Sequence, residues 1–327
     1  MPPSLTSRSL GTIWGVCVAD ALGGPVQFQK PGTFTPITGL RPVKPFAQPA
    51  GSYSDDGSMT LALAQSLIDS RGNYSQAHAL SIKYYIDWLS TGRFSTTDRA
   101  WDVGLSTRAA LLSWRKCGTV DLQRTQAVID RELDAEDRSG NGSVMRIAPV
   151  GLVLWRDVVE ARRVARVQGA VTHPSLACVE ACEVYTVVVC GVLRGEGKEA
   201  LCALVSGFPF THGDLVERLA TYKCLADWGR RNAEDVRSSG WVVDTLEVAL
   251  WGFFKYDCWA EGALAVANLG GDADTAAAVY GGLAGAFYGV DAIPAEWVEG
   301  MQNRTLIGEV AGQLAELVAS TDMREEN

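Results

Sequence analysis

Histidine is scarce in this chain, with three residues, and its eight cysteines include no CxxC pair. Zinc modules need closely spaced cysteine and histidine ligands, so a zinc-finger or zinc-ribbon domain is excluded. Cys178, Cys182 and Cys190 recur at helical spacing on one apolar segment, which favours buried, reduced thiols over disulfides. Reduced thiols indicate a reducing compartment, so we expect a cytoplasmic protein and leave a nuclear share open.

Clusters of positive charge and long apolar runs are also lacking. Lys and Arg number 29 against 38 Asp and Glu, a net charge of −9. No basic cluster stands out, which disfavours binding to nucleic acid or to anionic membranes. The opening MPPSLTSRSLGTIWG lacks the charged and apolar regions of a secretory signal. No apolar run reaches the roughly 18 residues that span a bilayer, so we expect no membrane association.

Apolar residues at helical spacing dominate what is present. Gly72, Gly118, Gly195 and Gly270 each fall just past such a segment, where a left-handed residue commonly ends a helix. No repeat or compositional change marks a linker. We therefore predict a compact all-α fold, a single domain over residues 1–327 with its core at about 8–320, and a monomer. Helices are expected at 59–70, 75–90, 106–118, 176–195, 213–231, 242–255, 259–270 and 274–289, and irregular segments at 23–56, 91–104 and 134–143.

Two groups of acidic and hydroxyl side chains stand at the starts of predicted helices, namely Ser54, Asp55 and Asp56, and then Asp272, Asp274 and Thr275. A single Asp or Ser at such a position is explained by helix capping. Adjacent carboxylates repel each other, so capping explains these groups poorly. Mg²⁺ and Mn²⁺ prefer oxygen ligands, and four carboxylates suffice for two ions about 3.5–4 Å apart. From the residues alone, a shared metal site and two independent caps both stay open.

Four ordered segments carry further motifs. They are GTIWGVCVADALGGPVQF (11–28), YSDDGSMTLAL (53–63), GNGSVMRIAPVGL (140–152) with THP (172–174), and GGDADTAAAVYGGLAGAFYG (270–289) with IPAEW (293–297). In this order they resemble the ADP-ribosylglycohydrolase family, which includes dinitrogenase reductase-activating glycohydrolase and the ADP-ribosyl-acceptor hydrolases. The resemblance covers nearly the whole chain.

This resemblance implies a hydrolase with an all-α fold and a dinuclear centre of two Mg²⁺ ions, or Mn²⁺, in a cleft. The substrate would be ADP-ribose joined to an acceptor, and a metal-bound water would cleave the glycosidic bond. Asp55, Asp56 and Asp274 would act through that water. The metal ligands would be the side chains of both acidic groups: Ser54, Asp55, Asp56, Asp272, Asp274 and Thr275.

The resemblance also implies that the loop around 139–146 binds substrate. Its consecutive backbone N–H groups at Asn141, Gly142 and Ser143 would face a diphosphate, and glycine permits close approach of the backbone. Met145 follows in the same binding loop. Arg146 either clamps the diphosphate or forms a structural salt bridge to a nearby acid, and the salt bridge is the favoured interpretation.

A second substrate loop is implied at WDVGLST (101–107), where Asp102 and Gly104 would face phosphate or ribose. His173 in the THP motif is either a ligand contact or a satisfied loop residue, and the two interpretations weigh equally. One aromatic side chain is expected to stack on adenine. The candidates, which the sequence does not rank, are Phe28, Trp101, Trp251, Phe253 and Tyr288.

The chain departs from the family pattern at Gln27. Many members have a glutamate there, close to the metals and suspected as a general base, but an amide cannot accept a proton at neutral pH. Ala19 likewise replaces a glycine of the opening motif. Asp20 is retained, and we expect a structural role for it over a catalytic one.

Three functions remain as alternatives. The first is a Mg²⁺-dependent hydrolase of an ADP-ribosylated acceptor, whose acceptor (arginine, serine, a nucleic-acid phosphate or an acetyl ester) and anomeric outcome stay open. The second is a protein that binds ADP-ribose without turnover. The third is a metal-dependent phosphoesterase acting on an ADP-ribose derivative. Six retained ligand-type residues argue against a purely structural role, because unpaired carboxylates are costly without cations.

Overall fold

The fold is built entirely from helices in the part of the chain that the computed structural model describes, residues 2–324. Two isolated β-bridges, Val43 with Gln48 and Gly140 with Trp241, are the extended pairings found there. The all-α prediction is confirmed. The α-helices are α1 (Leu5–Gly23), α2 (Asp55–Asp69), α3 (Tyr74–Thr91), α4 (Leu105–Cys117), α5 (Leu122–Leu133), α6 (Ala148–Val153), α7 (Val158–Ala170), α8 (Leu176–Leu193), α9 (Lys198–Ser206), α10 (Gly213–Arg218), α11 (Leu225–Gly229), α12 (Val242–Lys255), α13 (Trp259–Ala267), α14 (Ala273–Tyr288), α15 (Ala295–Glu299) and α16 (Arg304–Arg324). Short 3₁₀ turns are η1 (Gly24–Val26), η2 (Lys44–Phe46), η3 (Glu136–Arg138), η4 (Val144–Arg146), η5 (Ala233–Asp235) and η6 (Val290–Ala292).

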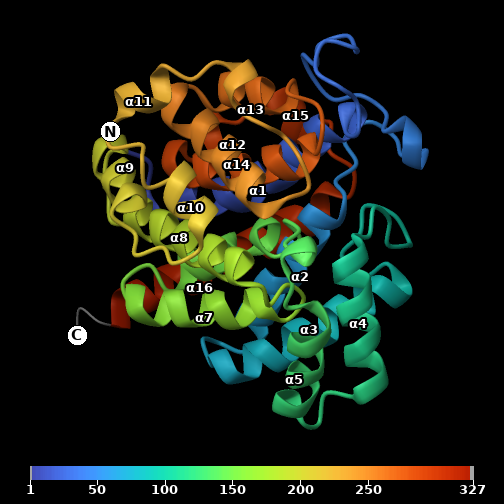
Figure 1. Cartoon of the computed structure of the whole chain (residues 1–327). Helices are drawn as coiled ribbons and strands as arrows, with labels where there is room; N and C mark the ends of the chain where they lie inside the picture. The colour runs from blue at the N-terminus through green and yellow to red at the C-terminus, as the bar shows by residue number, and fades with distance from the viewer. Residues whose placement is uncertain (1, 325–327) are drawn as a thin grey trace.

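The centre of the molecule is the pair α1 and α14, which share the most extensive contact between two helices (Figure 1). Their sequences, GTIWGVCVADALG and GGLAG, place glycines where the two backbones meet. A Cβ atom on Gly281 would lie 2.2 Å from the carbonyl oxygen of Gly15, and one on Gly285 would come even closer to Gly11. No side chain fits at such distances, so the glycines are what allows α14 to lie against α1 and fixes the start of α14 relative to α1.

Two helices are long and apolar enough to cross a membrane by length and composition. They are Leu5–Val26 and Leu176–Leu193, and 83% and 94% of their windows are buried inside the protein. This corrects the sequence-based expectation that no segment reaches that length. Core helices pass the same test, and the two glutamates of α8 are tied to protein partners: Glu180 accepts hydrogen bonds from Thr211, and Glu183 pairs with Arg162. The absence of membrane association stays a prediction.

The prediction of one helix over residues 213–231 is wrong, because the structure has two short helices there, α10 and α11. Arg218 at the end of α10 pairs with Asp244 and Glu247 on α12, and Tyr222 stacks on Trp228 with ring centroids 4.0 Å apart. These contacts fold the intervening turn back onto α12. Apolar spacing at 213–231 therefore reflects two short helices on one core, a tertiary effect that periodicity cannot resolve.

The helix stops and the cysteines follow the sequence-based expectations in most respects. Gly72, Gly118, Gly195 and Gly270 all adopt positive φ. All eight cysteines are free, and Cys178, Cys182 and Cys190 are buried. Cys117, Cys224 and Cys258 are exposed, which limits the core-thiol interpretation to the other five.

We expect Gly281→Ala to lower the free energy of unfolding by about 2–3 kcal/mol or more, because its methyl group would meet the backbone oxygen of Gly15. Chemical denaturation followed by circular dichroism measures this. The matched control is Gly312→Ala in α16, where a Cβ atom meets nothing within 4 Å. Because alanine favours helix over glycine, the control should gain up to about 1 kcal/mol. Equal effects of the two substitutions would show that the glycine contact does not limit the packing of α1 and α14.

Candidate active site and metal centre

A cleft of about 490 Å³ opens beside the starts of α2, α4 and α14. Its walls bring together residues that are far apart in the sequence, from the first, second, third and fourth motif segments. Most of the side chains expected at the site line it, namely Asp55, Asp102, Gly104, Asn141, Gly142, Met145, His173, Asp272, Asp274 and Thr275.

Three carboxylates from three helices meet next to this cleft, and one of them, Asp274, lines it. Asp20 lies near the end of α1, and Asp56 and Asp274 lie in the first turns of α2 and α14. One oxygen from each carboxylate lies within 4.8 Å of the others, and all three residues are buried. Helix α14 reaches this point because Gly23 of α1 lies against Asp274, where a Cβ atom would be 2.4 Å from the Asp274 nitrogen.

The two acidic groups of the sequence do meet in space. Ser54 caps α2, and its hydroxyl donates to Asp56 Oδ2 over 2.9 Å. Thr275 Oγ1, from the other group, donates to the same oxygen over 3.3 Å although the two residues are 219 positions apart. Separate, independent helix caps are thereby ruled out as the full explanation. Assignment of the six side chains as metal ligands stays a prediction.

Asp20 was expected to be structural, and one of its oxygens is. Asp20 Oδ2 accepts hydrogen bonds from the backbone N–H groups of Ser54 (2.8 Å) and Gly57 (2.9 Å), which positions the start of α2. Asp20 Oδ1 is buried and has no hydrogen-bond partner among the described residues, as is also true of Asp56 Oδ1. Asp20 is thus a candidate cation ligand through Oδ1, a role that the sequence interpretation missed. The sequence signal for it was a carboxylate on an otherwise apolar helix, within the first of the four motif segments.

The electrostatics of the cluster favour a cation. Burial raises the pKa of Asp20 to about 7, although the hydrogen bonds from Gly57 and Ser54 favour its ionised form. Burial and then the charge of Asp20 raise the pKa of Asp56 well above its usual range, and burial and then Asp272 do the same for Asp274. The hydrogen-bond partners described for these three carboxylates are hydroxyls and backbone N–H groups, which carry no positive charge. Oxygen-only donors with unpartnered buried atoms fit a hard divalent ion.

Asp55 and Asp272 complete the acidic side of the cleft. Burial and then Asp56 raise the pKa of Asp55 well above its usual range. Asp272 accepts a hydrogen bond from Asn141 Nδ2, which also donates to Thr245 over 2.9 Å. Asn141 therefore acts first through its side chain, by holding the GGDADT loop against the 140–146 loop.

The 140–146 loop depends on a glycine and on a buried arginine. A Cβ atom on Gly142 would lie 2.7 Å from His173 Cε1 and 2.8 Å from Thr107 Oγ1, so only glycine fits between those walls. Arg146 lies under the loop and donates to the carbonyl oxygens of Gly142 and Gln168 and to Thr172 Oγ1. It is fully buried and stacks near Tyr85.

This placement corrects one expectation about that loop. Arg146 has the favoured structural role, but its described partners are carbonyls and a hydroxyl, not an acid. The Ser143 side chain is fully buried and does not line the cleft, and the contact of its backbone N–H with a diphosphate stays a prediction. Periodicity and motif spacing could not show that the loop curls over Arg146 and turns Ser143 inward.

His173 has the satisfied-loop role that the sequence left open, and it also lines the cleft, while its contact with a ligand stays a prediction. Thr172 Oγ1 lies 2.8 Å from His173 Nδ1 and already accepts from Arg146. Burial and then the charge of Arg146 lower the pKa of His173 to about 3, so the ring is neutral. A satisfied loop histidine thus presents its ring to the cleft.

The two glycines of GGDADT position the backbone around Phe28, which also lines the cleft. Gly270 and Gly271 adopt positive φ, and Gly271 exchanges backbone hydrogen bonds with Phe28 and Gln29. Phe28 is 64% exposed and lines the cleft. Among the adenine-stacking candidates, Trp251 and Phe253 are core residues, Trp101 is buried beside Phe46, and the Tyr288 hydroxyl bonds Tyr256.

Gln27 lies behind this wall and is 1% exposed. Neither amide atom has a hydrogen-bond partner within normal geometry among the described residues. The amide is nevertheless near Asp102. Burial raises the pKa of Asp102 to about 6, and polar side-chain interactions with Gln27 and Asp274 act to lower it. Gln27 is therefore close to Asp102, an acidic residue of the cleft, and a position beside bound metal ions stays a prediction.

Comparison with known proteins supports the family resemblance over nearly the whole chain. The family model described as ADP-ribosylglycohydrolase matches residues 1–324. This chain belongs to the ADP-ribosylglycohydrolase family. It is 30% identical to ADP-ribosylarginine hydrolase Tri1 of Pseudomonas putida (strain GB-1), with 98% of this chain and 81% of the relative covered. It is 29% identical to ADP-ribosyl-[dinitrogen reductase] glycohydrolase of Rhodospirillum rubrum, with 90% of each covered.

A solved structure titled ADP-ribosylglycohydrolase-related protein complex shares the fold, with a TM-score of 0.76 and 31% identity over 96% of this chain and 99% of that one. The more distant human ADP-ribosylhydrolase ARH3 is 24% identical over 89% of this chain and 88% of the relative. The family resemblance, the all-α fold and the enzyme class, an ADP-ribosyl-acceptor hydrolase, are thereby confirmed.

The buried carboxylates make stability depend on pH and on divalent ions. Asp20 keeps its proton in the fold up to about pH 7, whereas an unfolded aspartate loses it near 3.9. Between these pH values the folded chain binds more protons than the unfolded chain. The stabilisation that the protonated Asp20 contributes is therefore complete below about pH 4 and is lost as pH rises towards 7. With a chelator present, we expect the Tm to fall from pH 5 to 7.5, because the free energy of unfolding falls by up to about 1.4 kcal/mol per pH unit for each such proton until pH reaches about 7.

Differential scanning calorimetry with and without Mg²⁺ measures this effect. Mg²⁺ should raise the Tm most at pH 7.5, because the ionised cluster then needs a counter-charge. A Tm that is independent of pH in chelator, or an equal Mg²⁺ effect at pH 5 and 7.5, would contradict the assignment of the cluster as a cation site.

Proposed function

We propose that this ADP-ribosylglycohydrolase cleaves the N-glycosidic bond between ADP-ribose and an arginine side chain, with two Mg²⁺ ions as cofactor and Mn²⁺ as the alternative. The observation that carries the proposal is the Asp20–Asp56–Asp274 cluster, which reaches a cleft lined by both substrate loops through Asp274. Two relatives at 30% and 28% identity are ADP-ribosylarginine hydrolases, which supports arginine as the acceptor.

In this proposal the ions are held by Asp20 together with the six side chains predicted from the sequence. Bound divalent ions supply charge stabilisation and lower the pKa of a water. The Gly142 backbone permits close approach of the diphosphate, and the N-terminus of α4 after Gly104 offers free N–H groups. Phe28 presents an exposed ring for the adenine.

Proton handling falls to carboxylates of this chain, because the Gln27 amide cannot accept a proton. Asp55 and Asp102 both line the cleft and are the candidates to take a proton from the attacking water. The 2-hydroxyl and 3-hydroxyl of the terminal ribose are the substrate groups that the acidic centre would orient while an oxocarbenium-like state forms at C1.

We also propose a cytoplasmic monomer, with a nuclear share left open, and no membrane or nucleic-acid partner. These statements follow from composition and from the reduced cysteines alone.

The deciding experiment is release of ADP-ribose from defined substrates in Mg²⁺. Matched peptides carrying ADP-ribose on arginine or on serine, a phosphate-linked ADP-ribosylated oligonucleotide and O-acetyl-ADP-ribose form the panel. We expect turnover of the arginine peptide to exceed the others by at least tenfold. Preference for another acceptor would overturn the arginine assignment, and binding of ADP-ribose without turnover would favour a binder. Hydrolysis of a P–O bond in place of the glycosidic bond, seen as release of AMP from any substrate or of ADP-ribose 1″-phosphate from the oligonucleotide, would favour a phosphoesterase.

Asp274→Asn should lower kcat by at least a hundredfold, because it removes charge from the three-carboxylate cluster and keeps the side-chain volume. The fold should survive, since removing a buried negative charge relieves repulsion. Kinetics on the preferred substrate, with calorimetry of Mg²⁺ binding, tests both points. Asp291→Asn, in η6 and outside the cleft lining, is the control. Full activity of Asp274→Asn would remove this carboxylate from the site.

Gln27→Glu should make the protein more dependent on Mg²⁺. A further buried carboxylate beside Asp102 adds repulsion in chelator and adds attraction once divalent ions bind. We expect a lower Tm than wild type in chelator, a larger rise on adding Mg²⁺, and a changed rate or acceptor preference. An unchanged Tm difference with an unchanged rate would show that Gln27 does not take part.

A further inference from the structure

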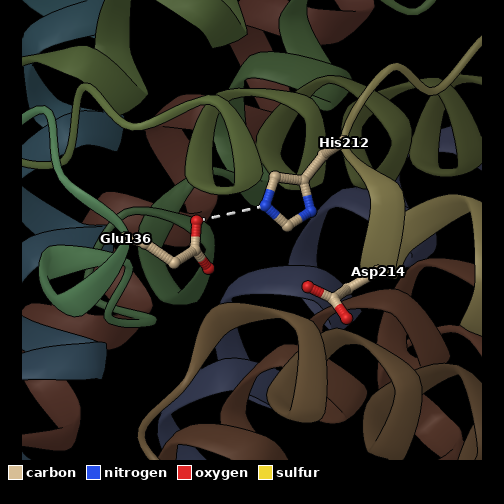
Figure 2. Close-up of side chains that lie close together, drawn as sticks. All are labelled: Glu136, His212 and Asp214. Atoms are coloured by element: carbon tan, nitrogen blue, oxygen red, sulfur yellow. Dashed lines mark hydrogen bonds and ion pairs between the residues drawn. The ribbon is translucent and has the colours of Figure 1, made fainter.

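A second group of ligand-type side chains lies outside the acidic centre. Glu136 in η3, His212 at the N-cap of α10 and Asp214 in its first turn each offer a ligand atom, and these atoms lie within 4.8 Å of one another. Figure 2 shows the three side chains converging from two segments, with the His212 ring between the two carboxylates. None of them belongs to the four family motifs or to the carboxylate cluster described above.

The turn that carries His212 is held in place by hydrogen bonds to Glu180 of α8. Glu180 of α8 is 4% exposed and accepts hydrogen bonds from Thr211 N at 2.9 Å and His212 N at 3.0 Å, and also from the Thr211 hydroxyl. A buried carboxylate thus fixes the backbone from which the imidazole projects. Ligands held by such outer contacts lose less entropy when an ion binds.

The spacing suits a single ion. His212 Nε2 and Glu136 Oε2 are 3.2 Å apart. Two ligand atoms each about 2.1 Å from one metal lie about 3.0–3.4 Å apart in octahedral or tetrahedral geometry. The ligand atom of Asp214 lies within 4.8 Å of the other two. His212 Nδ1 is also buried without a partner among the described residues, so the hydrogen bonding of this ring is incomplete in the protein alone.

We propose that Glu136, His212 and Asp214 bind a divalent transition-metal ion of the Zn²⁺ class. One imidazole nitrogen with two carboxylate oxygens is a donor set for such ions, and the nitrogen distinguishes it from the oxygen-only centre in the cleft. The ion neutralises two carboxylates that otherwise share one imidazole. It ties η3 to the start of α10, two segments 76 positions apart.

This link bears on the cleft because η3 forms part of its wall. Asp137 and Arg138, the two residues after Glu136, line the cleft, and Gly140 of the substrate loop follows. Asp137 and Arg138 are exposed. An ion bound at Glu136 therefore orders one rim of the substrate site, whatever the acceptor is.

The test is calorimetric titration of the full-length protein with Zn²⁺ in a large excess of Mg²⁺, which occupies oxygen-only sites. We expect one Zn²⁺ equivalent whose affinity falls at least tenfold in His212→Ala and in Glu136→Gln, the loss that removal of even an outer-shell partner causes. His78→Ala is the matched control, since it removes an imidazole outside this cluster, and it should bind Zn²⁺ as wild type does. Asp274→Asn should also keep the His212-dependent Zn²⁺ equivalent.

Equal Zn²⁺ affinity in wild type, His212→Ala and Glu136→Gln would overturn the proposal and leave the Glu136–His212 contact as an ion pair. The Glu136 side chain is 62% exposed, so Glu136→Gln should fold normally even where His212→Ala does not. Trypsin cleavage after Arg138 gives a second readout. Zn²⁺ should slow it severalfold in wild type and not in Glu136→Gln, and an identical effect in both would also overturn the proposal.

Discussion

Repulsion among carboxylates buried at the meeting point of α1, α2 and α14 is the constraint around which this structure is organised. Asp20, Asp56 and Asp274 lie in a helical core with no cationic partner among the described residues, a position that costs several kcal/mol for ionised groups. A divalent cation, as proposed above, would offset this cost. The three helix ends hold the carboxylates close together in the protein alone.

The helices around this point serve to hold it rigid. Glycines at 11, 15, 281 and 285 bring α1 and α14 into backbone contact, so that the end of one and the start of the other meet at the cluster. The substrate loops are fixed in a different way, by polar contacts: Arg146 fills the space under the 140–146 loop, and Asn141 ties that loop to Asp272. A tight apolar scaffold thus carries a cleft whose walls are positioned by hydrogen bonds.

Local chemistry in the sequence was enough to find most of the predicted site residues that line the cleft. Consecutive acids at Asp55 and Asp56 exceed what a helix cap needs, and the same excess at Asp272 and Asp274 pointed to the partner segment. Glycine stops and apolar spacing were enough for the all-α fold. What remained hidden depends on tertiary contacts: the break between α10 and α11, the inward turn of Ser143, and the carbonyl partners of Arg146.

Asp20 shows why a single residue could not be assigned from its sequence context. On a buried apolar helix a lone aspartate reads as structural, and Oδ2 does hold the start of α2 through Ser54 and Gly57. Those same two bonds require the carboxylate to stay ionised to be strong, whereas burial favours the protonated acid. The cation proposed for the cluster would resolve the conflict by favouring the charged form. Under that proposal, binding of the ion would strengthen the hydrogen bonds that hold the Ser54–Asp56 turn, which would link the cofactor to the fold and not only to the chemistry.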